Sequence, residues 1–147
     1  MKEKRIGLSL GGGLVLGAAH IGVLKAMDEL EIKPERVLGI SVGALIGALY
    51  CSGKTPAEIE EIAVELSWWD LASISISKMG LLSNQKMGGL IEKHNDGKEI
   101  EELEPAFTAV ATDVTNGCYK LFEEGDLAQA VRASSAIPGI FHPVELN

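Results

Sequence analysis

The sequence is poor in the residues on which several common chemistries depend. Its 147 residues include two cysteines, Cys51 and Cys118, and three histidines, His20, His94 and His142. Two cysteines cannot form a disulfide framework, and neither they nor the scattered histidines have the spacing of a metal site. We therefore expect reduced thiols in a cytosolic compartment, and we expect no metal and no other cofactor.

Long apolar runs are also missing. No stretch of about 18 consecutive apolar residues occurs, so no transmembrane helix is expected. The basic residues in Lys2–Arg5 and the apolar stretch Ile6–Ala19 imitate a secretory signal. However, five glycines interrupt that stretch, and it continues without a break into an amphipathic helical pattern that carries charged residues. We reject a signal peptide and expect a cytoplasmic protein, with transient contact at a membrane surface left open.

The sequence contains fewer basic than acidic residues. Lysine and arginine number 13 against 21 acidic residues, which gives a formal net charge of −8. This balance argues against nucleic acid as a partner and against strong attraction to anionic lipid headgroups, so any lipid contact must be apolar or local. Nothing in the sequence indicates an oligomeric state. The acidic residues form three groups, Glu58/Glu60/Glu61/Glu65, Glu99/Glu101/Glu102/Glu104 and Glu123/Glu124/Asp126.

What the chain does contain is enough apolar material for one core. Apolar residues make up 46% of the sequence, and the length suits one domain or part of one, so we treat 1–147 as a single unit. The first third alternates strand and helix patterns with short connections, which predicts an α/β fold with a mainly parallel sheet. The predicted elements here are the strand Lys4–Leu10, the helix Gly17–Leu30, the strand Arg36–Ile40 and a helix ending near Cys51.

Local signals place the remaining elements. Thr55-Pro56-Ala57-Glu58 is a capping box with proline at the first helical position, and it predicts a helix that runs to about Leu66. The apolar segment 67–82, which holds both tryptophans, is interpreted either as core or as a lid over an active site. Further predicted elements are the helix Asn84–His94, a hairpin of Ala106–Asp113 with Cys118–Glu123, and the helix Leu127–Ser134 capped by Asp126.

One motif points to nucleophilic catalysis. Gly39-Ile40-Ser41-Val42-Gly43 is a G-x-S-x-G between the second predicted strand and an apolar helix. A serine at the apex of a strand-to-helix turn has a strained backbone, and side chains two residues before and after it would collide. The helix N-terminus also directs its amides at the serine. We therefore predict that Ser41 is a nucleophile, with Gly39 and Gly43 as the small residues of the elbow.

A second motif can supply oxyanion donors. Gly11-Gly12-Gly13 follows the first predicted strand, and in a parallel sheet that turn lies at the same edge as the serine turn. Glycines leave their N–H groups uncovered, and acyl transfer needs such donors where the oxyanion forms.

Four segments in order resemble the bacterial patatin-like phospholipases. The resemblance implies a three-layer α/β/α fold and a Ser-Asp dyad that hydrolyses acyl esters of lipids, without a catalytic histidine. It makes Ser41 the nucleophile and makes the glycine-rich loop, Gly11, Gly12, Gly13 and Leu14, the oxyanion hole. The matching segments are Gly7–Ala26, Gly39–Ala44, Ala111–Asp113 with Gly117, and Ala130–Phe141.

The sequence departs from that family in two places. Counted back from Gly17, the third glycine of the family loop falls on Leu14, and the usual arginine or lysine falls on Leu16. The catalytic aspartate of the family lies in an Asp-Gly motif beyond the Pro-Gly-Ile-Phe segment, and that motif is absent. Asp96-Gly97 reads as a surface turn instead. The simplest interpretation is a C-terminally truncated hydrolase domain that lacks its base.

Other interpretations remain open at this point. Ser41, Asp113 and His142 have the chain order of an α/β-hydrolase triad, and an acyltransferase could use the same serine. Gly11-x-Gly13-x-x-x-Gly17 also matches a dinucleotide loop, although the second strand ends without the acidic residue that would hold the ribose. Finally, a relative without its aspartate could bind a lipid or a partner chain and catalyse nothing.

Overall fold

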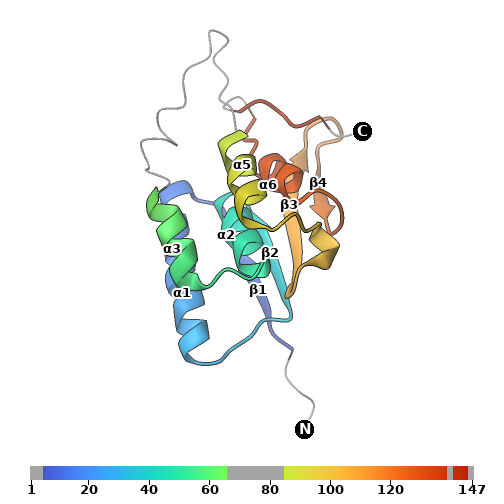
Figure 1. The fold of residues 1–147 in the computed structure, drawn as a ribbon. Helices are drawn as coiled ribbons and strands as arrows, with labels where there is room; N and C mark the ends of the chain where they lie inside the picture. The colour runs from blue at the N-terminus through green and yellow to red at the C-terminus, as the bar shows by residue number, and fades with distance from the viewer. Residues whose placement is uncertain (1–4, 66–84, 139–140, 146–147) are drawn as a thin grey trace.

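The described strands form one mainly parallel sheet of four strands, with the helices packed beside it (Figure 1). The computed structural model describes residues 5–65, 85–138 and 141–145. The strand order is β1-β2-β3-β4; the first three strands run parallel, and β4 pairs antiparallel with β3. Both the α/β class and the mainly parallel sheet are thus confirmed. The strands are β1 (Gly7–Leu10), β2 (Arg36–Ile40), β3 (Ala106–Asp113) and β4 (Cys118–Phe122).

The described helices follow the sequence prediction closely. The apolar segment 67–82, interpreted from the sequence as core or as a lid, lies outside the described residues. In the part of the chain that is described, no helix has the length and apolar character needed to cross a bilayer. The helices are α1 (Ala18–Glu29), α2 (Val42–Cys51), α3 (Pro56–Glu65), α5 (Gln85–His94) and α6 (Leu127–Ser134), with 3-10 turns η1 (Leu14–Gly17) and η2 (Ile100–Glu102).

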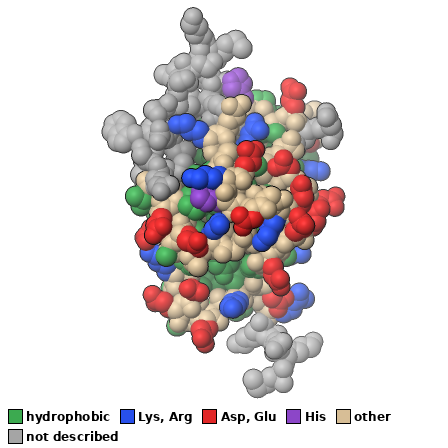
Figure 2. All heavy atoms as spheres, viewed as in Figure 1, with side chains coloured by type: hydrophobic (Ala, Val, Ile, Leu, Met, Phe, Trp, Pro, Cys, Tyr) green, Lys and Arg blue, Asp and Glu red, His purple; other side chains and the backbone are tan. Residues whose placement is uncertain are grey.

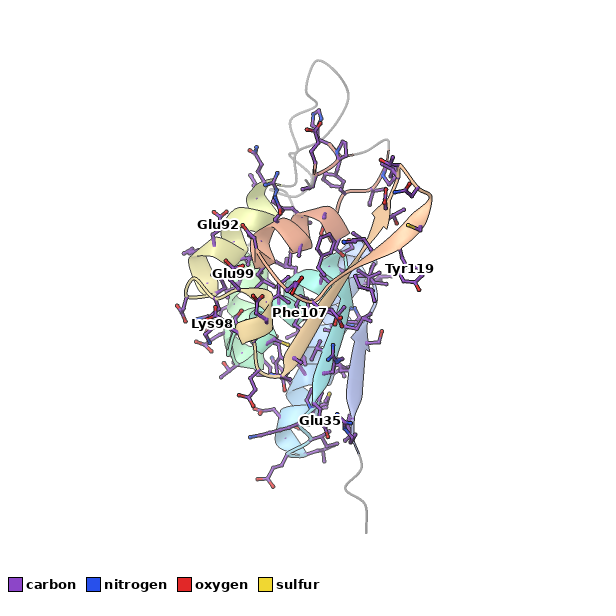
Figure 3. All side chains as sticks on the ribbon, turned by 90° about the vertical axis from the view of Figure 1, so that its right-hand side faces the viewer. Glu35, Glu92, Lys98, Glu99, Phe107 and Tyr119 are labelled. Atoms are coloured by element: carbon purple, nitrogen blue, oxygen red, sulfur yellow. The ribbon has the colours of Figure 1, made fainter. Side chains whose placement is uncertain are left out.

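These helices form a layer on one side of the sheet (Figure 3). Figure 3 shows Phe107 on the helix side of β3, where it is buried, whereas Tyr119 of β4 points away from the helices. Helix α2 is the centre of the core, because eight of its ten residues are buried. That explains its almost wholly apolar sequence. The described residues therefore supply two layers of the expected three.

Local capping signals have the predicted geometry. The backbone N–H of Thr55 donates to Glu58 Oε2 at 2.8 Å, and the N–H of Glu58 donates to Thr55 Oγ1 at 3.2 Å, so the capping box of α3 is complete. The side chain of Asp126 accepts the N–H of Gln129 at 2.8 Å and caps α6. Each cap satisfies backbone donors that a helix start otherwise leaves unpaired.

Charged side chains are spread over the surface (Figure 2). Figure 2 shows Asp and Glu side chains interspersed with Lys and Arg over the face in view. Among the described residues, ion pairs that join distant parts of the chain include Arg5 with Glu35, Lys25 with Glu60, and Arg36 with Glu123. All six side chains are more than a third exposed, so each pair contributes little to stability.

Candidate active site

Ser41 occupies the turn between β2 and α2. Strand β2 ends at Ile40, and α2 begins at Val42, so Ser41 alone makes the turn and is the N-cap residue of the helix. Its backbone has φ 55° and ψ −122°, a conformation that residues with a side chain rarely adopt. Holding such a conformation costs about 1–3 kcal/mol and requires support from the surrounding structure.

The two flanking glycines are required by close backbone contacts. A Cβ on Gly39 would lie 2.5 Å from the Cα of Ala44 and 2.6 Å from the carbonyl oxygen of Gly43. A Cβ on Gly43 would lie 2.6 Å from the carbonyl oxygen of Gly11 and would also overlap that of Leu10. Real Cβ atoms essentially never approach so closely, so any larger residue would open the turn. The steric reason predicted from the motif therefore holds for this chain.

The glycine-rich loop lies directly against this turn. Strand β1 pairs with β2 and ends at Leu10, opposite Gly39, so residues 11–13 emerge beside the serine. A Cβ on Gly12 would lie 3.4 Å from the Cβ of Ser41, and Gly13 has a φ of 145° that favours glycine. Leu14 begins the 3-10 turn η1. The predicted donors and the serine are thus brought together at one edge of the sheet.

The loop is held in place by contacts that the motif alone did not reveal. His20 Nε2 lies 2.8 Å from the carbonyl oxygen of Gly11, with the geometry of a hydrogen bond in which the ring N–H donates. The N–H of Leu16 donates to the carbonyl oxygen of Gly13 at 3.0 Å. The Leu16 side chain is 74% exposed, at the position where the resemblance predicts a cation. Leucine at this position brings no charge to the loop.

Ser134, at the end of α6, also contacts the serine turn. Its Oγ accepts the backbone N–H of Ser41 at 2.8 Å and lies 2.6 Å from the carbonyl oxygen of Val110, to which it donates. Sequence reasoning missed this residue as part of the site. The signal available was its place in the segment Ala130–Phe141, one of the four that resemble the family.

A cleft of about 580 Å³ opens beside Ser41. It lies at the end of the sheet where β2 and β3 finish, and most of its lining is apolar. In the described part of the chain, no carboxylate and no imidazole lines it. The lining residues are Gly12, Gly13, Ile40, Ser41, Val110, Ala111, Thr112, Tyr119, Ala133, Ser134, Ala136, Ile137 and Pro138.

The carboxylate of Asp113 is engaged elsewhere. Its Oδ1 accepts the N–H groups of Thr115 and Asn116 at 2.9 and 3.1 Å, and its Oδ2 accepts the side-chain amide of Asn116 at 2.7 Å. These hydrogen bonds, chiefly those from Asn116, lower the pKa of Asp113 below its ordinary value. A carboxylate stabilised in this way builds the hairpin turn and is a weak base. His142 is exposed and does not line the cleft, so the structure brings no triad together.

Asp96 and Gly97 form a turn after α5, as their sequence predicts. Both have positive φ, 55° and 74°, and the N–H of Gly97 donates to Asn95 Oδ1 at 3.0 Å. Neither residue lines the cleft. Within the ranges that the structure describes, no group of three or more His, Cys, Asp or Glu side chains could hold a metal ion.

Two solved structures have a similar fold. ExoU in the heterodimeric ExoU–SpcU complex from the type III secretion system of Pseudomonas aeruginosa has a TM-score of 0.66 at 18% identity, over 93% of this chain and 37% of that chain. A crystal structure of the type III effector protein ExoU has a TM-score of 0.61 at 17% identity, over 92% of this chain and 41% of that one. At these identities the likeness shows the fold alone.

Sequence comparison gives a more specific relationship. The neuropathy target esterases sws of Drosophila melanogaster and Drosophila persimilis are each 34% identical over 145 residues, which are 95% of this chain and 10% of theirs. The chain thus spans about a tenth of the length of these curated relatives. Residues 8–147 match the family described as patatin-like phospholipase. Because that match covers nearly the whole sequence, the chain belongs to the patatin-like phospholipase family.

Proposed function

We propose that this chain carries the nucleophile and oxyanion loop of a serine acyl hydrolase that cleaves acyl esters of lipids. The observation that carries the proposal is the placement of Ser41 in a strained strand-to-helix turn, against Gly12 and at the side of an apolar cleft. The family description names phospholipases, and the Drosophila relatives are named esterases, which supports ester hydrolysis by this fold.

The proposed reaction has two steps. A base takes the proton of Ser41 Oγ as the bond from Oγ to the ester carbonyl carbon forms. The carbonyl oxygen becomes an oxyanion, which accepts hydrogen bonds from N–H groups of the loop Gly11–Leu14. The C–O bond to the alcohol then breaks, and the leaving oxygen takes the proton from the base. In the second step water attacks the acyl-serine while the base takes a proton from the water. The bond between the acyl carbon and Ser41 Oγ then breaks, the proton returns to Oγ, and the fatty acid is released.

The base of the proposed dyad is not among the described residues that line the cleft. None of these lining residues carries a carboxylate, and no Asp-Gly follows the Pro-Gly-Ile-Phe segment in this sequence, where the family resemblance requires one. We propose that an aspartate outside these 147 residues completes the dyad. A serine hydrolase without its base loses several orders of magnitude in rate. The chain alone should therefore hydrolyse activated esters weakly or not at all.

Fluorophosphonate labelling followed by intact-mass analysis tests the assignment of the nucleophile. We expect one adduct on the native chain, mapped to Ser41 and absent in Ser41→Ala. Ser135→Ala is the matched control, because Ser135 is the C-cap residue of α6 and only 1% of its surface is exposed. An adduct that persists in Ser41→Ala would contradict the assignment of the nucleophile, whereas a folded chain that takes no label would show that Ser41 needs residues outside these 147 to react. Robust Ser41-dependent turnover of p-nitrophenyl esters would contradict the missing base.

Apolar side chains near the cleft support transient contact with a lipid surface. Leu16 and Tyr119 are each 74% exposed, and Ile137 is 37% exposed. Leu16 contacts Gly13, and the other two line the cleft. We expect weak flotation with phosphatidylcholine vesicles that Leu16→Asp reduces. Val64→Asp is the control, because Val64 is 73% exposed on α3 and does not line the cleft. An equal loss with both variants would show that the contact is not local to the site.

A further inference from the structure

We infer that Ser134 is a positioning residue for the nucleophile: its hydroxyl fixes the backbone of Ser41 in the conformation that aims the side chain at the glycine loop. The inference deepens the proposed function and rests on it for the role of Ser41. Its structural basis is a pair of short hydrogen bonds at 2.8 and 2.6 Å between residues that are far apart in the sequence.

The hydroxyl of Ser134 stands where the pairing of two strands ends. Ile40 of β2 is paired with Val110 of β3, and at Ser41 the chain leaves the sheet to enter α2. Ser134 Oγ lies between the N–H of Ser41 and the carbonyl oxygen of Val110, accepting from the first and donating to the second. The Ser134 hydroxyl thus links the N–H of Ser41 to the carbonyl oxygen of Val110, next to the last residue pair of β2 and β3.

This arrangement argues against a role for Ser134 in proton transfer. Its one hydroxyl proton is directed at Val110, and its oxygen already accepts from a backbone amide. What it can do is restrain the peptide on the N-terminal side of Ser41, whose φ of 55° is stable only when its surroundings hold it. Since small displacements of a nucleophile reduce its reactivity strongly, this restraint bears on the rate of acylation.

The helix that carries Ser134 is well anchored. Helix α6 is capped by Asp126, and its residues Ala130 and Val131 are fully buried against the sheet and the other helices. Gly88 of α5 lies so close to Arg132 that a Cβ there would be 2.5 Å from the Arg132 Cδ. Helix α6 also packs against α2, α5 and β3, so the position of the Ser134 hydroxyl is set by packing as well as by its bonds to Ser41 and Val110.

Two isosteric substitutions separate the hydroxyl from the shape of the side chain. Ser134→Thr keeps the hydroxyl, and Ser134→Val has the shape of threonine without it; Ser134→Ala serves where a branched side chain disturbs folding. Ser135→Ala is the matched control. Ser135 is the next residue, it is buried, and its Oγ has no hydrogen-bond partner in the described part of the chain.

Hydrogen exchange of the Ser41 amide, measured by NMR, tests the contact independently of reactivity. We expect protection in the native protein, in Ser134→Thr and in Ser135→Ala. In Ser134→Val and Ser134→Ala we expect exchange of the Ser41 amide at least tenfold faster, with core amides such as that of Leu49 unchanged. Unchanged protection in both variants without the hydroxyl would overturn the inference, whether or not Ser41 proves reactive.

Fluorophosphonate labelling rates then test the consequence for the nucleophile. We expect the rate constant at Ser41 to fall at least tenfold in Ser134→Val, to be restored largely in Ser134→Thr, and to stay near the native value in Ser135→Ala. Loss of amide protection with an unchanged labelling rate would show that the contact is structural only and would overturn the positioning role. A native chain that takes no label shows that Ser41 needs the base from outside these residues to react, and the exchange measurement then decides the contact by itself.

Discussion

The Cα of Gly43 packs against the carbonyl oxygen of Leu10, with no space between them for a side-chain carbon. Gly43 lies in the first turn of α2, and Leu10 is the last residue of β1. This close approach seats the helix N-terminus on the end of the first strand. As a result, the loop that follows Leu10 lies against Ser41. The absence of a side chain at Gly43 therefore allows the glycine-rich loop and the serine turn to lie side by side.

Gly43→Ala should therefore destabilise the fold even though alanine is the better helix former. The added Cβ would overlap backbone oxygens of Leu10 and Gly11, and the shift needed to accommodate it costs about 1–3 kcal/mol or more. Gly22→Ala in α1 is the control, since a Cβ there meets nothing within 4 Å. That variant should gain about 0.5–1 kcal/mol. Urea denaturation of both measures the difference, and a stabilised Gly43→Ala would contradict the packing described above.

Ser41→Gly and Ser41→Ala should differ in stability, although neither can be labelled. Alanine keeps a Cβ in the region of positive φ, whereas glycine adopts φ 55° without that strain. Relief of about 1–3 kcal/mol of strain outweighs the greater chain entropy of unfolded glycine, about 0.4–1 kcal/mol. We expect Ser41→Gly to be more stable by about 1 kcal/mol in denaturant titrations. A less stable glycine variant would show that the turn is relaxed in the native protein.

The sequence predicted those parts of the site that local patterns encode. G-x-S-x-G indicated the turn at Ser41, and the capping box at Thr55 and the hairpin around Gly117 were equally local, because each depends on residues a few positions apart. The contact of Ser134 with Ser41 spans 93 residues. Its existence depends on how α6 packs on the sheet, and no short pattern reports that. The same limit applies to His20, whose pairing with Gly11 depends on the path of the 3-10 turn between them.

The sequence also could not predict which face of the sheet the helices leave uncovered. Alternation within a strand shows which residues share a face but does not show which face a helix will cover. In β4, Tyr119 and Leu121 lie on one face and are 74% and 44% exposed, and Figure 3 shows Tyr119 pointing away from the helices. Their apolar character would have suggested burial. Only the register with β3 places them on the side opposite to Phe107.

The two cysteines should react at very different rates. Cys51 is buried in α2, and burial raises the pKa of its thiol to about 12, so at pH 8 the thiolate fraction is on the order of 10⁻⁴. Because the thiolate is the nucleophile, Cys51 should be inert. Cys118 is exposed on β4. Iodoacetamide at pH 8 should add one group to the native chain and two in denaturant. Cys118→Ser should leave the native chain unmodified, and rapid alkylation of that variant would show that α2 is not held in the core.

Asp113→Asn should weaken the fold in a pH-dependent way. Hydrogen bonds from Asn116 and Thr115 lower the pKa of Asp113 below its ordinary value of 3.8, so the ionised carboxylate stabilises the folded state. That contribution is complete above pH 3.8 and is lost as the pH falls through the folded-state pKa. The stability difference between the native protein and Asp113→Asn should therefore have its full value at pH 6 and should shrink below about pH 3.8. Denaturant titrations at a series of pH values measure it.

The same variant also tests whether Asp113 takes part in catalysis. If its carboxylate only builds the turn, Asp113→Asn should label with fluorophosphonate at the native rate wherever the variant is folded. Asn116→Ala removes the side-chain donor to Asp113 and should reproduce part of the stability loss, again without an effect on labelling. A large fall in the labelling rate at pH 7 in Asp113→Asn alone would point to a carboxylate that assists Ser41. Such a result would favour a triad in solution over a dyad whose aspartate comes from outside these residues.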